Sequence, residues 1–295
     1  MPPTAPVDFD KVALVLGQQK FFIAGTERSG TTWLQIMLNG HPDIACRGEG
    51  HFVDHLIPKI DDLFDEYRAT IGAFNKSYFK DTDGFPTPND AHRIFIKRLS
   101  IAMLMADFDA DKVQPVYGEK TPGNVRHLDT LLELFPNARF VFIVRDGRDV
   151  AVSLWHHGRR ENGPERPPLN DLAKGLATSW QSDLKKLMAF RDRYPNRTHI
   201  VRYEDLHATP QEELSGLFEF LDVPVTDEAI SSAVDAGDFK KFSGGRSRGE
   251  EDNSAQFRKG IVGDWQNYED ADIDKIFREI ANEEMTRMGY FGETS

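Results

Sequence analysis

The feature that most constrains the fold is the segment FFIAGTERSGTTW, residues 21–33. Its first four residues are apolar, as in a buried strand, and the residues from Thr31 onward are typical of a helix. The two parts are joined by GTERSGTT, with the glycine spacing of a phosphate-binding loop. Glycines permit the tight turn, and backbone N–H groups at the start of the helix attract an anion. The segment therefore predicts a strand–loop–helix unit that holds a phosphate group.

This loop lacks the lysine of ATP-binding loops. That lysine follows the second glycine and reaches the outer phosphates, and the next residue is a Ser or Thr that binds magnesium. Here Thr31 occupies the lysine position, Thr32 follows it, and the cation comes earlier, at Arg28. We therefore expect a phosphate ester rather than a magnesium triphosphate. The glycine spacing alone is also compatible with an ordinary strand–turn–helix.

Short apolar strands alternate with helices along the whole chain. The segment RFVFIV, residues 139–144, is almost entirely apolar, as strands covered on both faces are. This alternation predicts parallel βαβ units and an α/β fold whose central parallel sheet is flanked by helices on both faces. Strands are predicted at residues 20–24, 44–46, 116–119, 139–144 and 198–202, and helices at residues 31–39, 51–70, 91–107, 125–135, 149–157, 169–194, 211–221, 226–236 and 272–288.

The chain is expected to form one domain, because no linker-like change in composition divides residues 1–295. Residues 1–19 are predicted as an N-terminal extension before the first strand. Residues 72–89 are rich in Gly, Pro, Asp and Thr and are predicted to be irregular. Residues 240–263 are polar and rich in Gly and Ser, which predicts a mobile closing loop.

Composition argues against several functional classes. The chain has 36 Lys and Arg against 48 Asp and Glu, a net charge of −12, so no nucleic-acid partner is expected and positive charge must be local. No apolar run reaches the roughly 18–20 residues of a membrane helix, and no secretory signal is recognised. Cys46 is the only cysteine, which excludes an internal disulfide and fits a cytoplasmic location. The nine histidines form no metal-ligand pattern.

A second segment, FVFIVRDGRDVAVS, supplies a cation and a hydroxyl. Arg145 ends the predicted strand and Ser153 follows eight residues later, about two turns into the next helix. An Arg fork and a hydroxyl placed in this way are able to grip one terminal phosphate. The alternative is that Arg145 pairs with Asp146 or Asp149.

A third segment, FRKGIVGDWQNY, lies at residues 257–268. Arg258 and Lys259 precede Gly260 in a polar stretch, which is able to fold over a bound phosphate. The alternative is a solvated charge pair.

Together and in this order, the three segments resemble the sulfotransferases that use 3′-phosphoadenosine 5′-phosphosulfate (PAPS). RSGTTW resembles that family's P-loop-like 5′-phosphosulfate loop, VRDGRDVAVS its 3′-phosphate strand and helix, and RKGIVGDW the closing segment of its cytosolic members. The resemblance implies transfer of a sulfuryl group to a hydroxyl or amine by in-line displacement, with a carboxylate base. It also implies adenosine 3′,5′-bisphosphate (PAP) as the product and no metal requirement.

The resemblance assigns donor-binding roles residue by residue. Five residues hold the 5′-phosphosulfate, two aromatic residues contact the adenine, and five residues hold the 3′-phosphate. In that order they are Arg28, Ser29, Gly30, Thr31 and Thr32; Trp33 and Tyr203; and Arg145, Ser153, Arg258, Lys259 and Gly260.

The catalytic base is assigned by a further resemblance. HPDIACRGEGHFVD is similar to the segment that carries the base glutamate in tyrosylprotein and heparan sulfate 3-O-sulfotransferases, and Glu49 stands at the matching position. His51 is the main alternative base and His127 is another. The remaining alternative is that Glu49 only caps the next helix. Lys120, in GEKTP, matches a lysine near the transferred group or the acceptor. With Arg28 it is expected to stabilise the charge that develops there.

The sequence departs from the cytosolic members of the family in two places. Their first-loop lysine is Arg28 here, as in tyrosylprotein sulfotransferases. Their catalytic histidine is not found in its usual context, where this chain reads YGEKTPGNVRHL, which is more like carbohydrate and bacterial sulfotransferases.

The sequence leaves the acceptor and the oligomeric state open. A small-molecule, lipid or carbohydrate acceptor fits the acidic composition better than a heavily sulfated polysaccharide, and a homodimer is one option for the assembly. The first competing function is an ATP-dependent P-loop small-molecule kinase, which predicts a lysine where Thr31 stands. The second is a catalytically inactive nucleotide-binding relative, which predicts loss of Glu49, Arg28 or Lys120, yet all three are present.

Overall fold

A five-stranded parallel sheet forms the centre of the protein in a computed structural model. The structure describes residues 6–80, 83–108, 113–162, 167–253, 255, 257–268 and 271–292. The strands lie in the order β2-β3-β1-β4-β5. This confirms the predicted α/β fold. The strands are β1 Gln19–Ala24, β2 Ile44–Gly48, β3 Val116–Lys120, β4 Arg139–Val144 and β5 Thr198–Arg202.

The strand order changes direction at β1, because β3 lies on one side of it and β4 on the other. Parallel register places Ile23 beside both Lys120 and Val141. The loops that follow β1, β3 and β4 therefore leave the same edge of the sheet. In open α/β sheets, ligands bind at this edge where the strand order reverses.

Helices cover both faces of the sheet, and alternate strand residues face each layer. Phe21 and Ile23 pack with α2, α8, α9 and α10, whereas Phe22 and Ala24 belong to the core with α1, α4, α5, α6, α7 and α12. The first layer comprises α2 Thr31–Leu38, α8 Tyr203–Ala208, α9 Pro210–Leu221 and α10 Asp227–Ala236. The second comprises α1 Phe9–Gly17, α4 Asp90–Ala106, α5 Leu128–Leu134, α6 Gly147–Asn162, α7 Leu169–Arg193 and α12 Ile273–Arg287.

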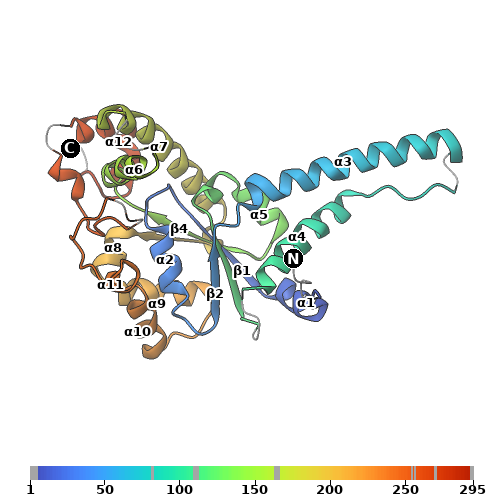
Figure 1. The fold of residues 1–295 in the computed structure, drawn as a ribbon, viewed down its shortest axis with the longest axis horizontal. Helices are drawn as coiled ribbons and strands as arrows, with labels where there is room; N and C mark the ends of the chain where they lie inside the picture. Colours follow the sequence, from blue (N-terminus) through green and yellow to red (C-terminus); the bar gives the residue numbers. More distant parts are fainter. Residues whose placement is uncertain are drawn as a thin grey trace.

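Between β2 and β3 the chain leaves the sheet as a long helical arm (Figure 1). A π-helical turn at Phe52–Leu56 leads into α3 Ile57–Phe74, a second π-helical turn follows at Asn75–Phe79, and α4 returns toward the sheet. Pro58 lies in the first turn of α3, where a missing N–H costs no helical hydrogen bond. It therefore begins this helix instead of interrupting it.

Three local predictions differ from the structure. Residues 72–79 are helical, so the expected irregular segment is confined to residues 83–89, and residues 81–82 lie outside the described part. The single helix expected at residues 125–135 is a 3-10 turn at Pro122–Arg126 followed by α5, because His127 has non-helical dihedral angles. The expected loop at residues 161–168 begins inside α6, and residues 163–166 lie outside the described part.

Helices occur in the predicted N-terminal extension and at the borders of the predicted closing loop. The N-terminal extension contains α1, whose Val12 and Val15 are buried in the main core. The short helix α11 Phe239–Phe242 overlaps the start of the predicted closing loop, residues 240–263, and the 3-10 turn Asp264–Asn267 follows directly after it. Among the helices of the described residues, none is both long enough and apolar enough to cross a bilayer.

Candidate active site

A cavity of about 430 Å³ opens where the loops after β1, β2 and β4 meet. Its size is within the range of small-molecule sites, about 300–1,000 Å³. Thirteen of the fifteen predicted site residues line it, and Ser29 and Lys120 do not. Those thirteen are Arg28, Gly30, Thr31, Thr32, Trp33, Glu49, His51, Arg145, Ser153, Tyr203, Arg258, Lys259 and Gly260.

The loop after β1 turns into α2 through two residues with left-handed backbone conformation. Arg28 has φ 69° and Gly30 has φ 99°. A Cβ atom on Gly30 would lie 2.6 Å from Cδ2 of Tyr203, so only glycine fits there. No side chain caps α2 at Gly30, which leaves the first N–H groups of that helix available to an anion in the cavity.

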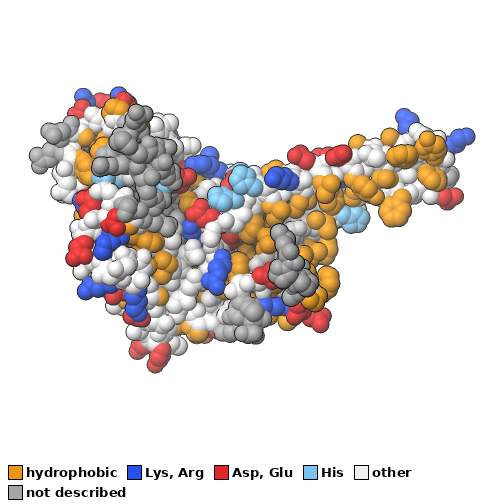
Figure 2. Space-filling model, viewed as in Figure 1, with side chains coloured by type: hydrophobic (Ala, Val, Ile, Leu, Met, Phe, Trp, Pro, Cys, Tyr) orange, Lys and Arg blue, Asp and Glu red, His pale blue; other side chains and the backbone are white. Residues whose placement is uncertain are grey.

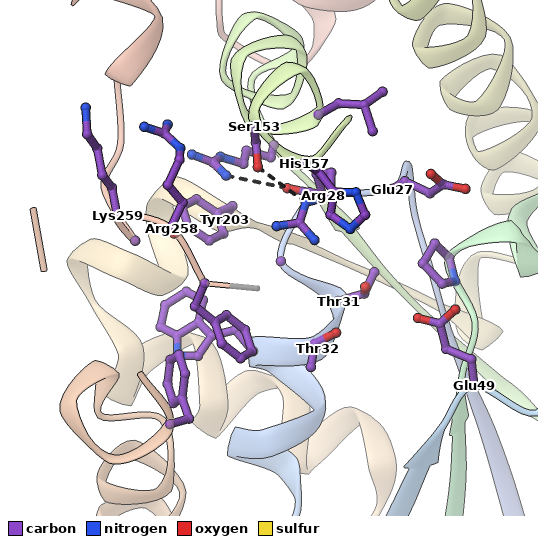
Figure 3. A pocket seen from close by; sticks show the side chains of 18 of the residues that line it. Glu27, Arg28, Thr31, Thr32, Glu49, Ser153, His157, Tyr203, Arg258 and Lys259 are labelled. Carbon is purple, nitrogen blue, oxygen red and sulfur yellow. Dashed lines mark hydrogen bonds between the residues drawn. The ribbon is translucent and has the colours of Figure 1, made fainter. Parts of the chain in front are cut away.

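Ser153 meets this loop from the other side (Figure 3). Arg145, from the same predicted motif, also contacts the loop and lines the cavity. Nε of Arg28 donates to Oγ of Ser153 at 3.4 Å, and Nη1 of Arg145 donates to the backbone oxygen of Arg28 at 3.4 Å. The Arg145 guanidinium lies 4.4 Å from the ring centroid of Tyr203. Burial opposes its charge, but the fields of Tyr203 and Asp149 outweigh this and raise the pKa of Arg145 above its ordinary value.

The carboxylate of Asp149 joins Arg145 to the closing segment. Its Oδ2 accepts from Nη2 of Arg145 at 3.3 Å and from the backbone N–H of Gly263 at 2.8 Å. Its Oδ1 accepts from the backbone N–H of Trp265 at 3.0 Å. The alternative pairing of Arg145 with Asp149 is therefore present, while Arg145 still lines the cavity.

Arg258 and Lys259 line the cavity and are paired with carboxylates. Arg258 contacts Asp264 and, at 2.9 Å, Glu251, while Lys259 lies 3.0 Å from Asp264 and 3.3 Å from Glu251. They are therefore not a solvated charge pair. Burial favours protonation of Asp264, but hydrogen bonds from Arg258 and Lys259 outweigh it and lower the pKa of Asp264.

An aromatic group surrounds the cavity between these cations and α2. The ring of Trp33 makes an edge contact with Tyr203 at 5.3 Å, and its Nε1 donates to the backbone oxygen of Gly237 at 2.9 Å. The sequence prediction missed four further lining residues: Phe239, Phe242, Arg248 and Phe257. The only sequence signals for them are the spacing of two aromatics in DFKKF and a phenylalanine just before RKG.

Glu49 lies at the opposite end of the cavity from Arg258 and Lys259, with Thr31 and Thr32 between them (Figure 3). Nζ of Lys120 is 2.6 Å from Oε1 of Glu49, so Lys120 meets the cavity only through this carboxylate. Nε2 of His51 is 3.4 Å from Oε2 of Glu49. Both candidate bases from the RGEGH turn thus face the same space.

A buried carboxylate fixes the turn that carries Glu49. Oε1 of Glu119 accepts from the backbone N–H of Gly50 at 2.9 Å and from Oγ1 of Thr121 at 2.5 Å, and its Oε2 accepts from Nδ2 of Asn124 at 2.7 Å. Burial raises the pKa of Glu119, although these hydrogen bonds oppose the rise. The sequence prediction did not identify this role.

Four further charged or titratable lining residues were not predicted. They are Glu27, Asp54, Arg126 and His157, and His157 lies beside Ser153 and Arg28 (Figure 3). Asp54 pairs with Nε2 of His127 at 3.0 Å and with Nδ1 of His51 at 3.4 Å. His127 itself does not line the cavity. Within the described residues, no group of three or more His, Cys, Asp or Glu is placed to hold a metal ion.

The cavity fits a ligand that has two anionic groups and a flat base, which are the features of PAPS. Arg145 and Arg258 line the cavity, and the Nε atom of each is buried without a hydrogen-bond partner among the described atoms. The start of α2 offers backbone N–H groups to a second anion. Trp33 and Tyr203 offer aromatic surface between them.

Comparison with known proteins identifies sulfotransferases as relatives of this chain. The profile described as Sulfotransferase family matches residues 20–227. Protein-tyrosine sulfotransferase A of Caenorhabditis elegans is 27% identical over 210 residues, which cover 71% of this chain and 51% of that protein. Protein-tyrosine sulfotransferase of Drosophila melanogaster is 27% identical over 212 residues, which cover 71% of this chain and 39% of that protein. The chain thus spans about half of the length of the first relative and 39% of the length of the second.

Solved structures share the fold across nearly the whole chain. Mouse sulfotransferase SULT7A1 complexed with PAP has a TM-score of 0.55 at 16% identity, covering 96% of this chain and 92% of that one. Sulfotransferase STF9 from Mycobacterium avium has a TM-score of 0.53 at 16% identity, covering 96% and 87%. At these identities the likeness shows the fold alone. The family profile covers well over half of the sequence, and the chain therefore belongs to the sulfotransferase family.

Proposed function

We propose that this chain transfers a sulfuryl group from PAPS to a hydroxyl or amine of an acceptor, with Glu49 as the base. The observation that carries the proposal is the order of groups along one cavity. Glu49 lies at one end, the start of α2 in the middle, and Arg258 and Lys259 at the other end (Figure 3). The donor supplies the sulfuryl group and leaves as PAP.

The end of the cavity with Arg258 and Lys259 binds and orients the donor PAPS. Arg145 and Ser153, with Arg258 and Lys259, form a cationic pocket for the 3′-phosphate, and the adenine lies among Trp33, Tyr203 and the neighbouring aromatics. Guanidinium forks suit this task, because they form paired charge-assisted hydrogen bonds with phosphate oxygens. Asp149 keeps the closing segment against Arg145 through its two backbone hydrogen bonds.

The middle of the cavity stabilises charge. Arg28 and the backbone N–H groups at Thr31 and Thr32 face the position of the 5′-phosphosulfate. Donors that are fixed before the reaction stabilise developing negative charge without reorganising, and in comparable oxyanion sites one donor contributes about 3–4 kcal/mol.

The acceptor end removes a proton. Glu49 accepts it from the attacking hydroxyl or amine, and Lys120 holds the carboxylate in place from behind. Glu27, Asp54 and Glu49 make this end rich in carboxylates. This favours a neutral small molecule, lipid or carbohydrate over an acceptor that already carries sulfate or phosphate groups.

The test is a transfer assay with a panel of neutral acceptors: a simple phenol, a tyrosine peptide, a long-chain alcohol and a hexose. The protein is incubated with PAPS and each acceptor, and PAP and the sulfated product are followed by mass spectrometry. We expect PAP to form in step with one sulfated product. ADP formation from magnesium-ATP, with no PAP from PAPS, would instead support the kinase alternative.

A further inference from the structure

The arm formed by α3 and α4 is held together as a hairpin by ion pairs. Nη1 of Arg93 is 3.3 Å from Oδ1 of Asp61, and Nζ of Lys97 is 2.6 Å from the same oxygen. Nearer the tip, Nη2 of Arg68 is 3.1 Å from Oδ1 of Asp90. These bridges keep the two helices side by side while the arm projects away from the sheet (Figure 1).

A second face of α3 and its π-helical extension is apolar and exposed. Leu63, Tyr67, Phe74 and Tyr78 are 62%, 46%, 53% and 73% exposed. Their spacing brings them onto one stripe of the helix, and the rings of Phe74 and Tyr78 stack at 5.8 Å. Apolar side chains gather along the arm in Figure 2.

The exposed apolar area of the arm is as large as one half of a stable interface. The four stripe residues expose roughly 450 Å², taking about 200 Å² for a whole aromatic side chain. Three further exposed residues, Phe85, Phe95 and Ile96, bring the arm to roughly 800 Å². A standard interface buries about 800 Å² on each partner, with polar and apolar area counted together.

The four stripe residues are placed symmetrically along the helix. Leu63 and Tyr78 are equally far from the point between residues 70 and 71, and so are Tyr67 and Phe74. If two copies of the helix cross antiparallel at that point, Leu63 meets the partner's Tyr78 and Tyr67 meets the partner's Phe74. Thr70 is exposed on the same stripe and lies next to the symmetry axis.

The charges beside the stripe have opposite signs on its two halves and are centred on residue 71, half a residue from the centre of the stripe. Asp62 and Glu66 lie toward the base of the arm, and Lys76 and Lys80 lie toward its tip. All four are exposed, and none forms an ion pair with another residue in the described ranges. An antiparallel crossing about a two-fold axis places the acidic pair of one arm beside the basic pair of the other.

We propose that this chain forms a homodimer through its α3 arms, which pair antiparallel about a two-fold axis at residues 70–71. An interface between identical copies must be complementary to itself, and both the stripe and its flanking charges meet that condition. A lipid surface would cover the apolar side chains but would not require the paired charges. The proposal does not depend on the reaction proposed above.

The first test measures mass by sedimentation equilibrium at micromolar concentrations. We expect about twice the 33.5 kDa of one chain. Tyr67→Lys and Glu66→Lys should each give monomers, while the double variant Glu66→Lys with Lys76→Glu should restore the dimer. Val225→Lys, at a residue that is 39% exposed outside the arm, is the control and should remain dimeric. A monomeric wild type, or a dimer unaffected by the arm variants, would overturn the proposal.

The second test locates the axis by disulfide cross-linking. Cys46 is buried, so it does not compete with an introduced surface cysteine. Thr70→Cys should cross-link to its own copy under mild oxidation, because the two residues face each other across the axis. Ser77→Cys is the matched control, since its two copies would lie about 20 Å apart along the helices, beyond the reach of a disulfide. Equal cross-linking of both variants, or binding of wild-type monomers to neutral lipid vesicles without Thr70→Cys cross-linking, would contradict the proposed pairing.

Discussion

The ammonium group of Lys120 lies 2.6 Å from Oε1 of Glu49 and only 4% of its side chain is exposed. Lys120 does not line the cavity, whereas Glu49 does. The lysine therefore holds the carboxylate from behind and leaves the rest of the carboxylate facing the acceptor end. His51, on the same turn, contacts both Glu49 and Asp54.

Glu49→Gln is expected to lower the rate of sulfuryl transfer by at least a hundredfold, because general-base catalysis contributes about 10²–10⁴-fold. PAP affinity should not change, since Glu49 is at the opposite end of the cavity from the cations. His51→Gln, two residues away, is the matched variant and should retain most activity. The measurement is initial rate of PAP formation with a reactive acceptor. Normal activity in Glu49→Gln together with loss of activity in His51→Gln would instead assign the role of base to His51.

Arg28→Ala or Lys120→Ala is expected to lower turnover roughly a hundredfold or more. The two residues act differently. Arg28 faces the cavity, so its loss should also weaken PAP binding. Lys120 acts through Glu49, so Lys120→Ala combined with Glu49→Gln should be little slower than Glu49→Gln alone. Wild-type turnover in either single variant would remove that residue from the mechanism.

Asp149→Asn is expected to weaken PAP binding about tenfold, because hydrogen bonds to charged groups contribute about 1.5–3 kcal/mol. The variant loses charge beside Arg145 and presents an amide N–H toward one of the two backbone N–H groups of the closing segment. Calorimetry gives the affinity, and limited proteolysis reports whether residues 257–268 become more accessible. Asp146→Asn is the control: Asp146 pairs with Arg148 at 2.7 Å, and neither residue lines the cavity. It should lower thermal stability without changing PAP affinity.

The stability that the Asp264 carboxylate contributes should decrease as the pH becomes acidic. Its pKa in the folded protein is lower than its ordinary value of about 3.9. The contribution is therefore fully present above that ordinary value and is lost as pH falls through the lower, folded-state value. Asp264→Asn should cost about 3 kcal/mol at neutral pH, since it leaves Arg258 and Lys259 partly unpaired. Melting curves of both proteins from neutral to acidic pH should converge in acid, and a gap that widens there would show that the sign is wrong.

The sequence predicts the sheet well because its strands are apolar enough to be recognised locally. β4 begins and ends where RFVFIV does, and the other four strands were found to within two residues at either end. The arm was harder, because Gly72 counts as a helix breaker in isolation. In the structure an added Cβ at Gly72 would meet nothing within 4 Å, and the helix continues past it.

In the candidate site, too, local sequence patterns were predicted better than contacts between distant segments. Residues within a motif, such as Arg145 and Ser153, lie where the spacing predicts. Contacts between distant segments were missed, among them Asp149 with Trp265 and Phe239 with Gly260. The motif around Ser29 was found, but its side chain is buried away from the cavity, which local spacing does not reveal.

The central claim is that the cavity is a PAPS site, and calorimetric titration with PAP beside magnesium-ATP tests it most directly. We predict tight binding of PAP, weakened by Arg145→Ala, and no comparable binding of magnesium-ATP. Binding of magnesium-ATP alone, or PAP binding unaffected by Arg145→Ala, would contradict the proposed donor site.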